Sequence, residues 1–254
     1  MDYPKAIEEY CKYIKLPEIR KHYKTIAEEA SEESLTYENY LFLLLRKEEE
    51  KRKMNRVISQ IRIAKFPEKK YLEDLNLDEL PKSARMRFNE LRSLDFVRKG
   101  QNLIFTGNPG TGKTHLAIGL GIEACQKGFR VLFTSIPSLV TKLKESRSER
   151  TLRRMESKFD KYDLVICDEF GYISFDKEGA ELLFSNLSLR AGRKSIIITS
   201  NLSFDRWNEV FHDPVLTAAM IDRLTYKSYL IDMTGDSYRM KETKQWLQNS
   251  KPRN

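Results

Sequence analysis

The sequence predicts an α/β fold built around a parallel sheet, preceded by a small all-helical domain. From residue 101 onward, short apolar segments of strand length alternate with longer segments of helical spacing, which is typical of a parallel sheet with helices on both faces. The first strand is followed by the glycine-rich stretch "GNPGTGKT" at residues 107–114, a pattern that indicates phosphate binding. Residues 1–66 contain no glycine and carry leucine, isoleucine and tyrosine at helical spacing.

The helical domain is expected to span residues 1–66. Ser34 or Thr36 could cap its second long helix, and Pro67 would end that helix. Residues 67–99 are interpreted as a linker joined to a helix that leads into the main domain, residues 100–254. The apolar faces of two helices in the first domain are expected to be formed by Leu16, Ile19 and Tyr23, and by Tyr40, Leu41, Leu44 and Leu45.

The main domain should contain five strands. A helix is expected to follow the glycine-rich stretch, to about residue 127, and helical patterns cover 137–160 and 177–190. Two short helices should precede the last strand. The strands are predicted at residues 102–106, 130–135, 163–169, 195–201 and 228–233.

Composition and charge restrict the class of protein. A net charge of +8 favours nucleic acid or another polyanion as partner, although a basic surface that binds nothing is the alternative. The start "MDYPKAIEEY" shows no secretory signal, and the longest apolar run in the first fifty residues, "LFLLL", is far short of a membrane span. Three cysteines give no disulfide framework and three scattered histidines no metal spacing, so a reducing cytoplasm is expected, without a membrane.

The glycine-rich stretch fits the pattern G-x-x-x-x-G-K-[ST] between a strand and a helix, as a phosphate-binding loop requires. Its glycines, Gly107, Gly110 and Gly112, let backbone N–H groups approach the phosphates closely, and the helix N-terminus adds positive potential. Lys113 would bridge the β- and γ-phosphates of ATP, and Thr114 would bind Mg²⁺. The other residues of the stretch that are expected to line the nucleotide site are Asn108, Pro109, Thr111 and His115.

Two acidic residues follow an apolar run at the end of the third predicted strand. Ligands bind at the carboxyl edge of a parallel sheet, so Asp168 would hold Mg²⁺, directly or through water. Glu169 would orient and polarise the attacking water. An acidic strand end that only caps a turn is the structural alternative. The second acid favours hydrolysis over transfer to a small substrate.

A polar residue also closes the fourth predicted strand. Asn201 would point toward the γ-phosphate and position the water together with Glu169, unless it only forms a turn. Thr199 and Ser200 are weaker candidates for the same role.

Hydrolysis needs positive charge on the γ-phosphate in the transition state. Arg223, in "IDRLTYK", follows an amphipathic segment before the fifth strand and could act as an arginine finger in the site of a neighbouring subunit. An ordinary surface arginine is the alternative for this residue. The rival candidates for the finger are Arg190, Arg193 and Arg239.

Four stretches together resemble the IstB-like ATP-binding proteins of bacterial insertion sequences. They are "GNPGTGKTHLAIGLG", "DLVICDEFGYIS", "IIITSNLSFDRWNEVF" and "DRLTYKSYLIDMTGDSYRMK". This family consists of transposition helper ATPases, close relatives of the DnaC helicase loaders. The resemblance implies the three-layer AAA+ fold with sheet order 5-1-4-3-2. It assigns Walker A to Gly107–Thr114, Walker B to Asp168 and Glu169, sensor 1 to Asn201 and the box VII arginine to Arg223.

The C-terminal end departs from the wider AAA+ pattern. Most AAA+ proteins follow the fifth strand with a helical lid that carries a second arginine sensor, but only residues 234–254 follow it here. A full lid is therefore not expected, which is similar to the IstB and DnaC branch. Arg239, in "SYRMK", could partly substitute for the missing sensor in contacting the nucleotide.

Two stretches have a local excess of basic residues that suits contacts with DNA phosphates. "RKEEEKRKMNR", at residues 46–56, contains more acid than "TKLKESRSERTLRR", at residues 141–154, and either could be only a solvated helix face. No recognition helix or zinc finger is evident, so little sequence specificity is expected. The DNA-binding candidates are Lys142, Lys144, Arg147, Arg150, Arg153 and Arg154.

The function that these motifs and the resemblance imply is that of an ATPase that assembles as a ring or spiral on duplex DNA. It would assist a cognate transposase, and DNA or that partner would stimulate hydrolysis. Residues 1–66 would contact the transposase or DNA, and the protein would lie on the nucleoid when bound to DNA. A replicative helicase loader that prefers single strands is the main alternative. A nucleotide-gated DNA scaffold without turnover is a third, and a small-molecule kinase fits least.

Overall fold

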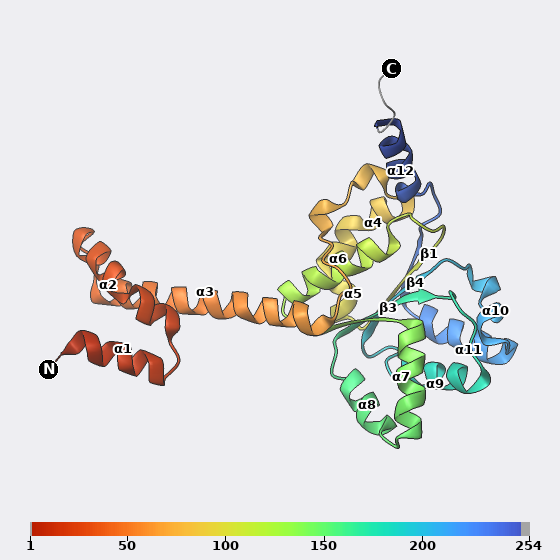
Figure 1. The fold of residues 1–254 in the computed structure, drawn as a ribbon, viewed down its shortest axis with the longest axis horizontal. Coiled ribbons are helices and arrows are strands. Elements are labelled where there is room, and N and C mark those ends of the chain that lie inside the picture. Colours follow the sequence, from red (N-terminus) through yellow and green to blue (C-terminus); the bar gives the residue numbers. More distant parts are fainter. Residues whose placement is uncertain (1, 250–254) are drawn as a thin grey trace. The chain divides into compact units, whose positions relative to one another are not determined.

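A computed structural model describes residues 2–249 of the chain (Figure 1). The chain divides into two compact units, Met1–Ser59 and Gln60–Asn254, and the division falls within a long helix, α3 (Tyr37–Ala64). The functional division into residues 1–66, 67–99 and 100–254 stays a prediction. No helix among residues 2–249 is long and apolar enough to cross a membrane.

The first unit packs α1 (Tyr3–Tyr13) and α2 (Pro17–Glu32) against the N-terminal part of α3. Thr36 caps α3, since its hydroxyl accepts a hydrogen bond from the backbone N–H of Asn39 at 3.3 Å. Helix α2 has no capping side chain of its own. The buried carboxylate of Glu48 caps it instead, accepting hydrogen bonds from the backbone N–H groups of Glu18 and Ile19 at 2.9 and 3.3 Å.

The prediction of which residues form the apolar face of α3 was partly wrong. Leu44 is buried, and Tyr40 and Leu43 pack against the same cluster. Leu41 and Leu45, however, are 53% and 51% exposed. Consecutive residues of a helix point about 100° apart, so the run "LFLLL" cannot place all its side chains on one face.

The second unit contains a five-stranded sheet in which every pair is parallel. The strand order is β2-β3-β4-β1-β5, which confirms the AAA+ order 5-1-4-3-2. Alternate residues of β1, β3 and β4 enter different cores. In β1, for example, Leu103 and Phe105 join one cluster and Ile104 joins the other. The strands are β1 (Asn102–Thr106), β2 (Val131–Ser135), β3 (Leu164–Phe170), β4 (Ser195–Ser200) and β5 (Ser228–Asp232).

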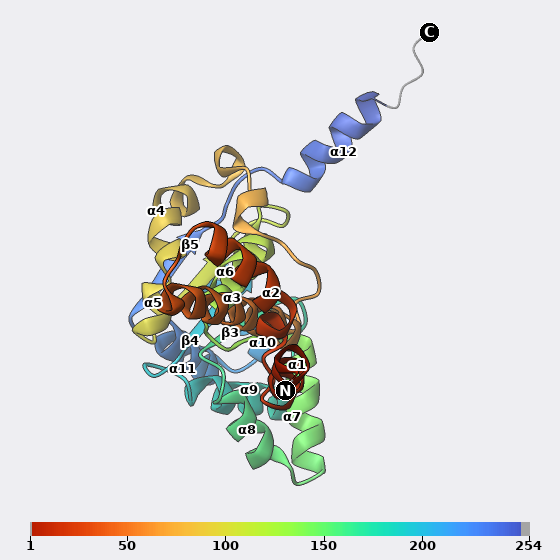
Figure 2. The same cartoon turned by 90° about the vertical axis from the view of Figure 1, so that its left-hand side faces the viewer.

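Helices cover both faces of the sheet and so give the three layers (Figure 1 and Figure 2). One face is covered by α4 (Lys82–Ser93), α5 (Asp95–Arg98) and α6 (Lys113–Gln126). The other is covered by α7 (Ile136–Ser148), α8 (Leu152–Phe159), α9 (Lys177–Ser188), α10 (Asn208–Phe211) and α11 (Pro214–Thr225). The short 3₁₀ helices are η1 (Leu72–Asp74), η2 (Leu77–Glu79) and η3 (Phe204–Arg206).

In the described part of the chain, a single helix, α12 (Tyr238–Asn249), follows β5. The helical region predicted at 137–160 is two helices, because the chain turns at Arg150, whose φ of 57° is left-handed.

Candidate active site

A pocket of about 610 Å³ opens at the carboxyl edge of the sheet. Its walls come from four segments: the phosphate-binding loop, the ends of β3 and β4, the segment before α4, and the start of α12. The sequence-predicted residues that line it are Pro109, Gly110, Thr111, Gly112, Lys113, Thr114, His115, Asp168, Glu169, Thr199, Asn201 and Arg239. The size suits a bound nucleotide.

The phosphate-binding loop is shaped by glycines in backbone conformations that other residues adopt with strain. Gly107 has a φ of 143°, and a Cβ added there would lie 2.3 Å from the carbonyl carbon of Met233. Gly110 has a φ of 81°, and an added Cβ would lie 2.2 Å from Oγ of Ser237. The segment after β5 therefore presses directly on the loop. It is also tied to the loop by the backbone N–H of Tyr238, which donates to the carbonyl of Gly110 at 2.9 Å.

Lys113 is the first residue of α6 and is buried beneath the loop. Its ammonium group donates hydrogen bonds to the carbonyl oxygens of Gly107 and Asn108, at 2.7 and 2.6 Å. Burial lowers the pKa of Lys113 to about 8; the Asp168 carboxylate opposes this effect and Arg239 adds to it. The ammonium group is thus held at the loop and would exchange carbonyl partners for phosphate oxygens.

This lowered pKa predicts a pH dependence of ATP affinity. Phosphates bind the protonated lysine and raise its pKa, so the dissociation constant should be constant below about pH 8 and rise by up to about tenfold per pH unit above it. The measurement is ATP binding between pH 7 and 9.5. The Lys113→Arg variant should bind ATP more weakly than the wild type, but its affinity should not depend on pH, because arginine stays charged over this range. A wild-type affinity that is constant to pH 9.5 would contradict the assignment.

The hydroxyl of Thr114 and the carboxylate of Asp168, two residues that line the pocket, are brought together. Thr114 Oγ1 donates to Asp168 Oδ1 at 3.0 Å, and Thr199 Oγ1 donates to the same carboxylate oxygen. Hydroxyl and carboxylate oxygens are the ligands that Mg²⁺ accepts beside water and phosphate, so this pair fits the ion. Thr199 was only a weak candidate for positioning water; its hydroxyl contacts the acidic pair instead.

Glu169 occupies an irregular position in β3. Its φ is 63°, and the register between β3 and β4 shifts between Cys167 and Phe170. A left-handed conformation costs a non-glycine residue about 1–3 kcal/mol and is typical of functional sites. The backbone N–H of Glu169 donates to Thr199 Oγ1 at 3.2 Å. The bulge turns the side chain of Glu169 outward to the pocket, where Asn201 also lies.

Aromatic packing holds the backbone on the C-terminal side of this bulge. Phe170, next to Glu169, is buried against Trp207 and Phe211, with ring centroids 4.1 and 5.7 Å apart. Trp207 belongs to the segment that follows Asn201. The cluster therefore connects the end of β3 with the chain beyond β4.

The candidate arginines lie in three different places. Arg239 lines the pocket, whereas Arg223 does not. Arg223 is exposed on α11, with its guanidinium carbon 5.3 Å from the ring centroid of Phe184. It is therefore available to another molecule rather than to the pocket of its own chain.

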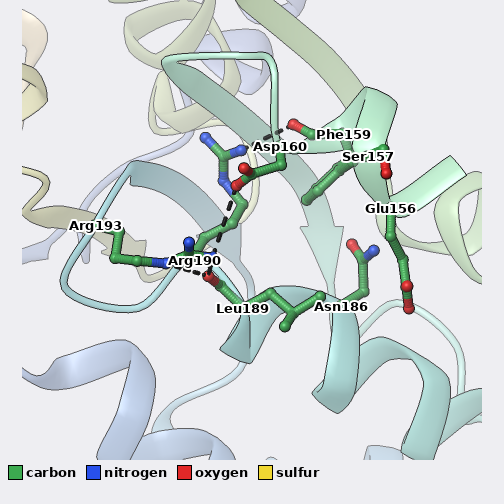
Figure 3. A pocket seen from close by; sticks show the side chains of 8 residues that line it. All are labelled: Glu156, Ser157, Phe159, Asp160, Asn186, Leu189, Arg190 and Arg193. Carbon is green, nitrogen blue, oxygen red and sulfur yellow. Dashed lines mark hydrogen bonds and ion pairs between the residues drawn. The ribbon is translucent and has the colours of Figure 1, made fainter. Parts of the chain in front are cut away.

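Arg190 and Arg193 lie at the opposite, amino-terminal edge of the sheet, around a separate small cavity (Figure 3). Arg190 is only 1% exposed and donates to the backbone carbonyls of Phe159 and Tyr162 at 2.9 and 2.8 Å. Its guanidinium group is thus used to hold the chain before β3, and Arg190 cannot serve as a finger.

Sequence reasoning missed the wall that the segment before α4 contributes. His115 and the carbonyl of Tyr71 are 3.0 Å apart, and Leu72 packs so closely on α6 that a Cβ on Gly119 would lie 2.5 Å from it. The leucine spacing in "YLEDLNLDELP" was a signal that this segment packs on the domain. The pocket residues that it supplies are Lys70, Asp74, Leu75, Asn76, Glu79 and Leu80.

The six DNA-binding candidates lie on α7, α8 and the turn between them, apart from the pocket-lining residues. Two of them are paired with carboxylates near the start of α9: Lys144 with Asp176 at 2.6 Å, and Arg147 with Glu178 at 3.5 Å. The other four are exposed and make no ion pair within residues 2–249; they are Lys142, Arg150, Arg153 and Arg154.

The second basic stretch lies on α3 and is different. Three of its six cations pair with carboxylates one helical turn away: Arg46 with Glu50, Arg52 with Glu48, and Lys53 with Glu49. Such pairing favours a solvated helix face over a phosphate-binding surface.

Curated relatives match nearly the whole chain. The chain is 35% identical over 236 residues to the insertion sequence IS5376 putative ATP-binding protein of Geobacillus stearothermophilus, covering 93% of this chain and 94% of that one. It is 36% identical over 229 residues to the insertion sequence IS21 putative ATP-binding protein of Pseudomonas aeruginosa, covering 90% and 86%.

Solved structures share the fold. A crystal structure of DnaI superimposes with a TM-score of 0.55 at 21% identity, over 65% of this chain and 91% of that one. The replication initiator DnaA bound to AMPPCP and single-stranded DNA gives 0.55 at 22% identity, over 74% and 58%. The family model of the IstB-like ATP binding protein matches residues 10–246. With its phosphate-binding loop, its paired acids and these relatives, the chain belongs to the IstB-like ATP-binding proteins.

Proposed function

We propose that this protein hydrolyses ATP, assembles on duplex DNA and assists a transposase in selecting or activating its target. The observation that carries the proposal is one pocket that combines the phosphate-binding loop, the Thr114–Asp168 pair and an outward-turned Glu169. The relatives' names place them in insertion sequences. Related proteins that share nearly the full length support the same setting for this chain.

The loop and the start of α6 would bind the phosphates of ATP. Backbone N–H groups of residues 110–114 and the helix N-terminus supply positive potential, and Lys113 would contact the β- and γ-phosphates. Thr114 and Asp168 would hold Mg²⁺, which would supply positive charge against the charge that develops on the phosphates. Thr199 keeps the Asp168 carboxylate oriented through its hydroxyl.

Glu169 would orient the attacking water and accept its proton, and Asn201 would fix the position of that water. Both residues line the pocket at the carboxyl edge of the sheet. The hydrogen bond from the Glu169 backbone to Thr199 links the proton acceptor to the residue that orients Asp168. The two acids are therefore positioned by one hydroxyl group.

The active site is proposed to be completed by a second subunit. Arg223 does not line the pocket of its own chain. Its guanidinium group is exposed and lies over the ring of Phe184. Delivered to a neighbour's γ-phosphate, it would stabilise the charge of the transition state. ATP would then favour the assembled state because only that state supplies the arginine.

The two remaining surfaces suit the two proposed partners. Lys142, Arg150, Arg153 and Arg154 offer unpaired cations for the phosphates of duplex DNA. The first unit exposes several large apolar side chains, among them Tyr13 (83%), Tyr37 (91%) and Phe42 (59%). Such side chains are typical of a protein interface, and we assign the transposase contact to this unit.

Binding of labelled random-sequence duplex tests the DNA surface. Replacing Arg153 and Arg154 together by alanine should weaken binding equally for all sequences and reduce the slope of log affinity against log salt by about two, roughly one per lost phosphate contact. Replacing Lys47 and Lys51 of α3 is the matched control and should change nothing. An unchanged slope for the α8 variant would show that Arg153 and Arg154 do not contact DNA phosphates. A wild-type preference for single strands would favour a helicase loader.

A further inference from the structure

Two of the predicted DNA-binding cations are occupied within the chain by carboxylates of one neighbouring segment. Lys144 pairs with Asp176, the N-cap residue of α9, and Arg147 pairs with Glu178 in the first turn of α9. The helices α7 and α9 lie side by side (Figure 1) and pack tightly here, since a Cβ on Gly179 would lie 2.9 Å from Val140 Cγ1. The basic helix is thus fastened to the beginning of α9.

Asp176 has two roles that its two carboxylate oxygens separate. Oδ1 accepts the backbone N–H of Gly179 at 3.0 Å and caps α9, whereas Oδ2 accepts Lys144 Nζ at 2.6 Å. The hydrogen bond from Lys144 is the main cause that holds the pKa of Asp176 below its ordinary value, and the hydrogen bond from the backbone of Gly179 adds to this effect. Asp176 is therefore ionised at neutral pH and bound to Lys144 as a carboxylate.

The start of α9 is connected to the catalytic end of β3 by a short loop, residues 171–175. The loop is anchored at its far end by Phe175, whose backbone N–H donates to Val210 at 2.9 Å. The ring of Phe175 lies 6.4 Å from that of Phe211, which in turn packs against Phe170 beside Glu169. A displacement of Asp176 would thus reach Glu169 both along the chain and through these rings.

We propose that Asp176 is a positioning residue through which duplex DNA controls Glu169. Without DNA, the Lys144–Asp176 pair holds the start of α9 and the loop before it in one arrangement. The phosphates of bound DNA compete for Lys144 and Arg147 and release the two carboxylates. The start of α9 and the loop then shift, and Glu169, whose left-handed backbone is intrinsically costly, moves to the position that activates water. This inference rests on the proposed binding of DNA by α7 and α8.

The exposure of the pair suits a switch better than a permanent fastening. The side chains of Lys144 and Asp176 are 36% and 59% exposed. Exposed ion pairs contribute little to stability and are screened by salt, so a polyanion with closely spaced phosphates can displace the carboxylate. Buried pairs would resist such an exchange.

Two variants of the pair should agree in one measurement and differ in another. Asp176→Asn retains a cap for α9 but loses the charge that binds Lys144. Its ATPase rate without DNA should rise toward the DNA-stimulated rate of the wild type, and the stimulation ratio should fall toward one. Lys144→Gln should raise the rate without DNA in the same way. Duplex affinity should increase for Asp176→Asn, which frees a lysine, and decrease for Lys144→Gln, which removes one.

The matched control is Glu181→Gln, on the exposed side of α9, which removes the same charge but makes no ion pair within residues 2–249. It should keep the wild-type rate, stimulation and DNA affinity. If the wild type binds duplex and is stimulated by it, but Asp176→Asn behaves like Glu181→Gln, the coupling is refuted and the proposed function stands. If duplex neither binds to the wild type nor stimulates it, the proposed function fails and the coupling with it.

Discussion

Glu169→Gln should retain ATP binding and lose hydrolysis by about two to four orders of magnitude, the contribution typical of a positioned general base. Glutamine preserves the size of the side chain and its capacity to orient water, but it cannot accept the proton. The left-handed backbone at residue 169 and its N–H bond to Thr199 remain available to the variant. Phosphate release at saturating ATP, with and without duplex, measures the loss, and nucleotide titration measures the binding.

Glu181→Gln serves again as the control, since it makes the same substitution on an exposed face of α9. Its turnover should equal that of the wild type. A Glu169→Gln protein that releases phosphate within about threefold of the wild-type rate would show that another group accepts the proton.

Arg223→Ala should lower the hydrolysis rate about a thousandfold, the lower end of the range for arginine fingers, with little change in ATP affinity. The reason is its position: Arg223, on α11, lies over the ring of Phe184 on the neighbouring helix α9 and does not line the pocket of its own chain. Removing it should leave the phosphate-binding loop and the acidic pair intact. Steady-state hydrolysis at saturating ATP and duplex measures the effect.

A mixing experiment shows whether the arginine acts between subunits. Lys113→Ala subunits have a damaged pocket but an intact Arg223, whereas Arg223→Ala subunits have the reverse. Activity should return when the two inactive proteins are combined. Arg193→Ala, at the opposite edge of the sheet, is the control and should be active alone. A mixture that assembles but stays inactive would contradict catalysis across an interface.

The parallel sheet was predictable because its inner strands, β1, β3 and β4, are buried on both faces and are therefore largely apolar. The predicted segment 102–106 coincides with β1, and the other strand limits differ by no more than a residue or so. The carboxyl ends of parallel strands share one edge, so Asp168, Glu169 and Asn201 could be expected to meet the phosphate-binding loop. Their catalytic roles stay predictions.

Other features depend on tertiary approach and could not be predicted from local pattern. The role of Thr199 follows from the register between β3 and β4, which shifts at a bulge. Nothing in the sequence "VICDEF" indicates that bulge. The availability of Lys144 depends on Asp176, a residue 32 positions away in the sequence. The exposure of Leu41 and Leu45 is set by which side of α3 meets α2.

The most direct test of the central claim is the size of the purified protein by light scattering, with ATP and Mg²⁺, in three conditions: alone, with random-sequence duplex, and with single strands. The account predicts large assemblies that need both ATP and duplex. ATP is needed because its site is completed only by a second subunit, and duplex is needed because its phosphates bind the cations of α7 and α8. A protein that stays monomeric with duplex, or that assembles only with single strands, would contradict it.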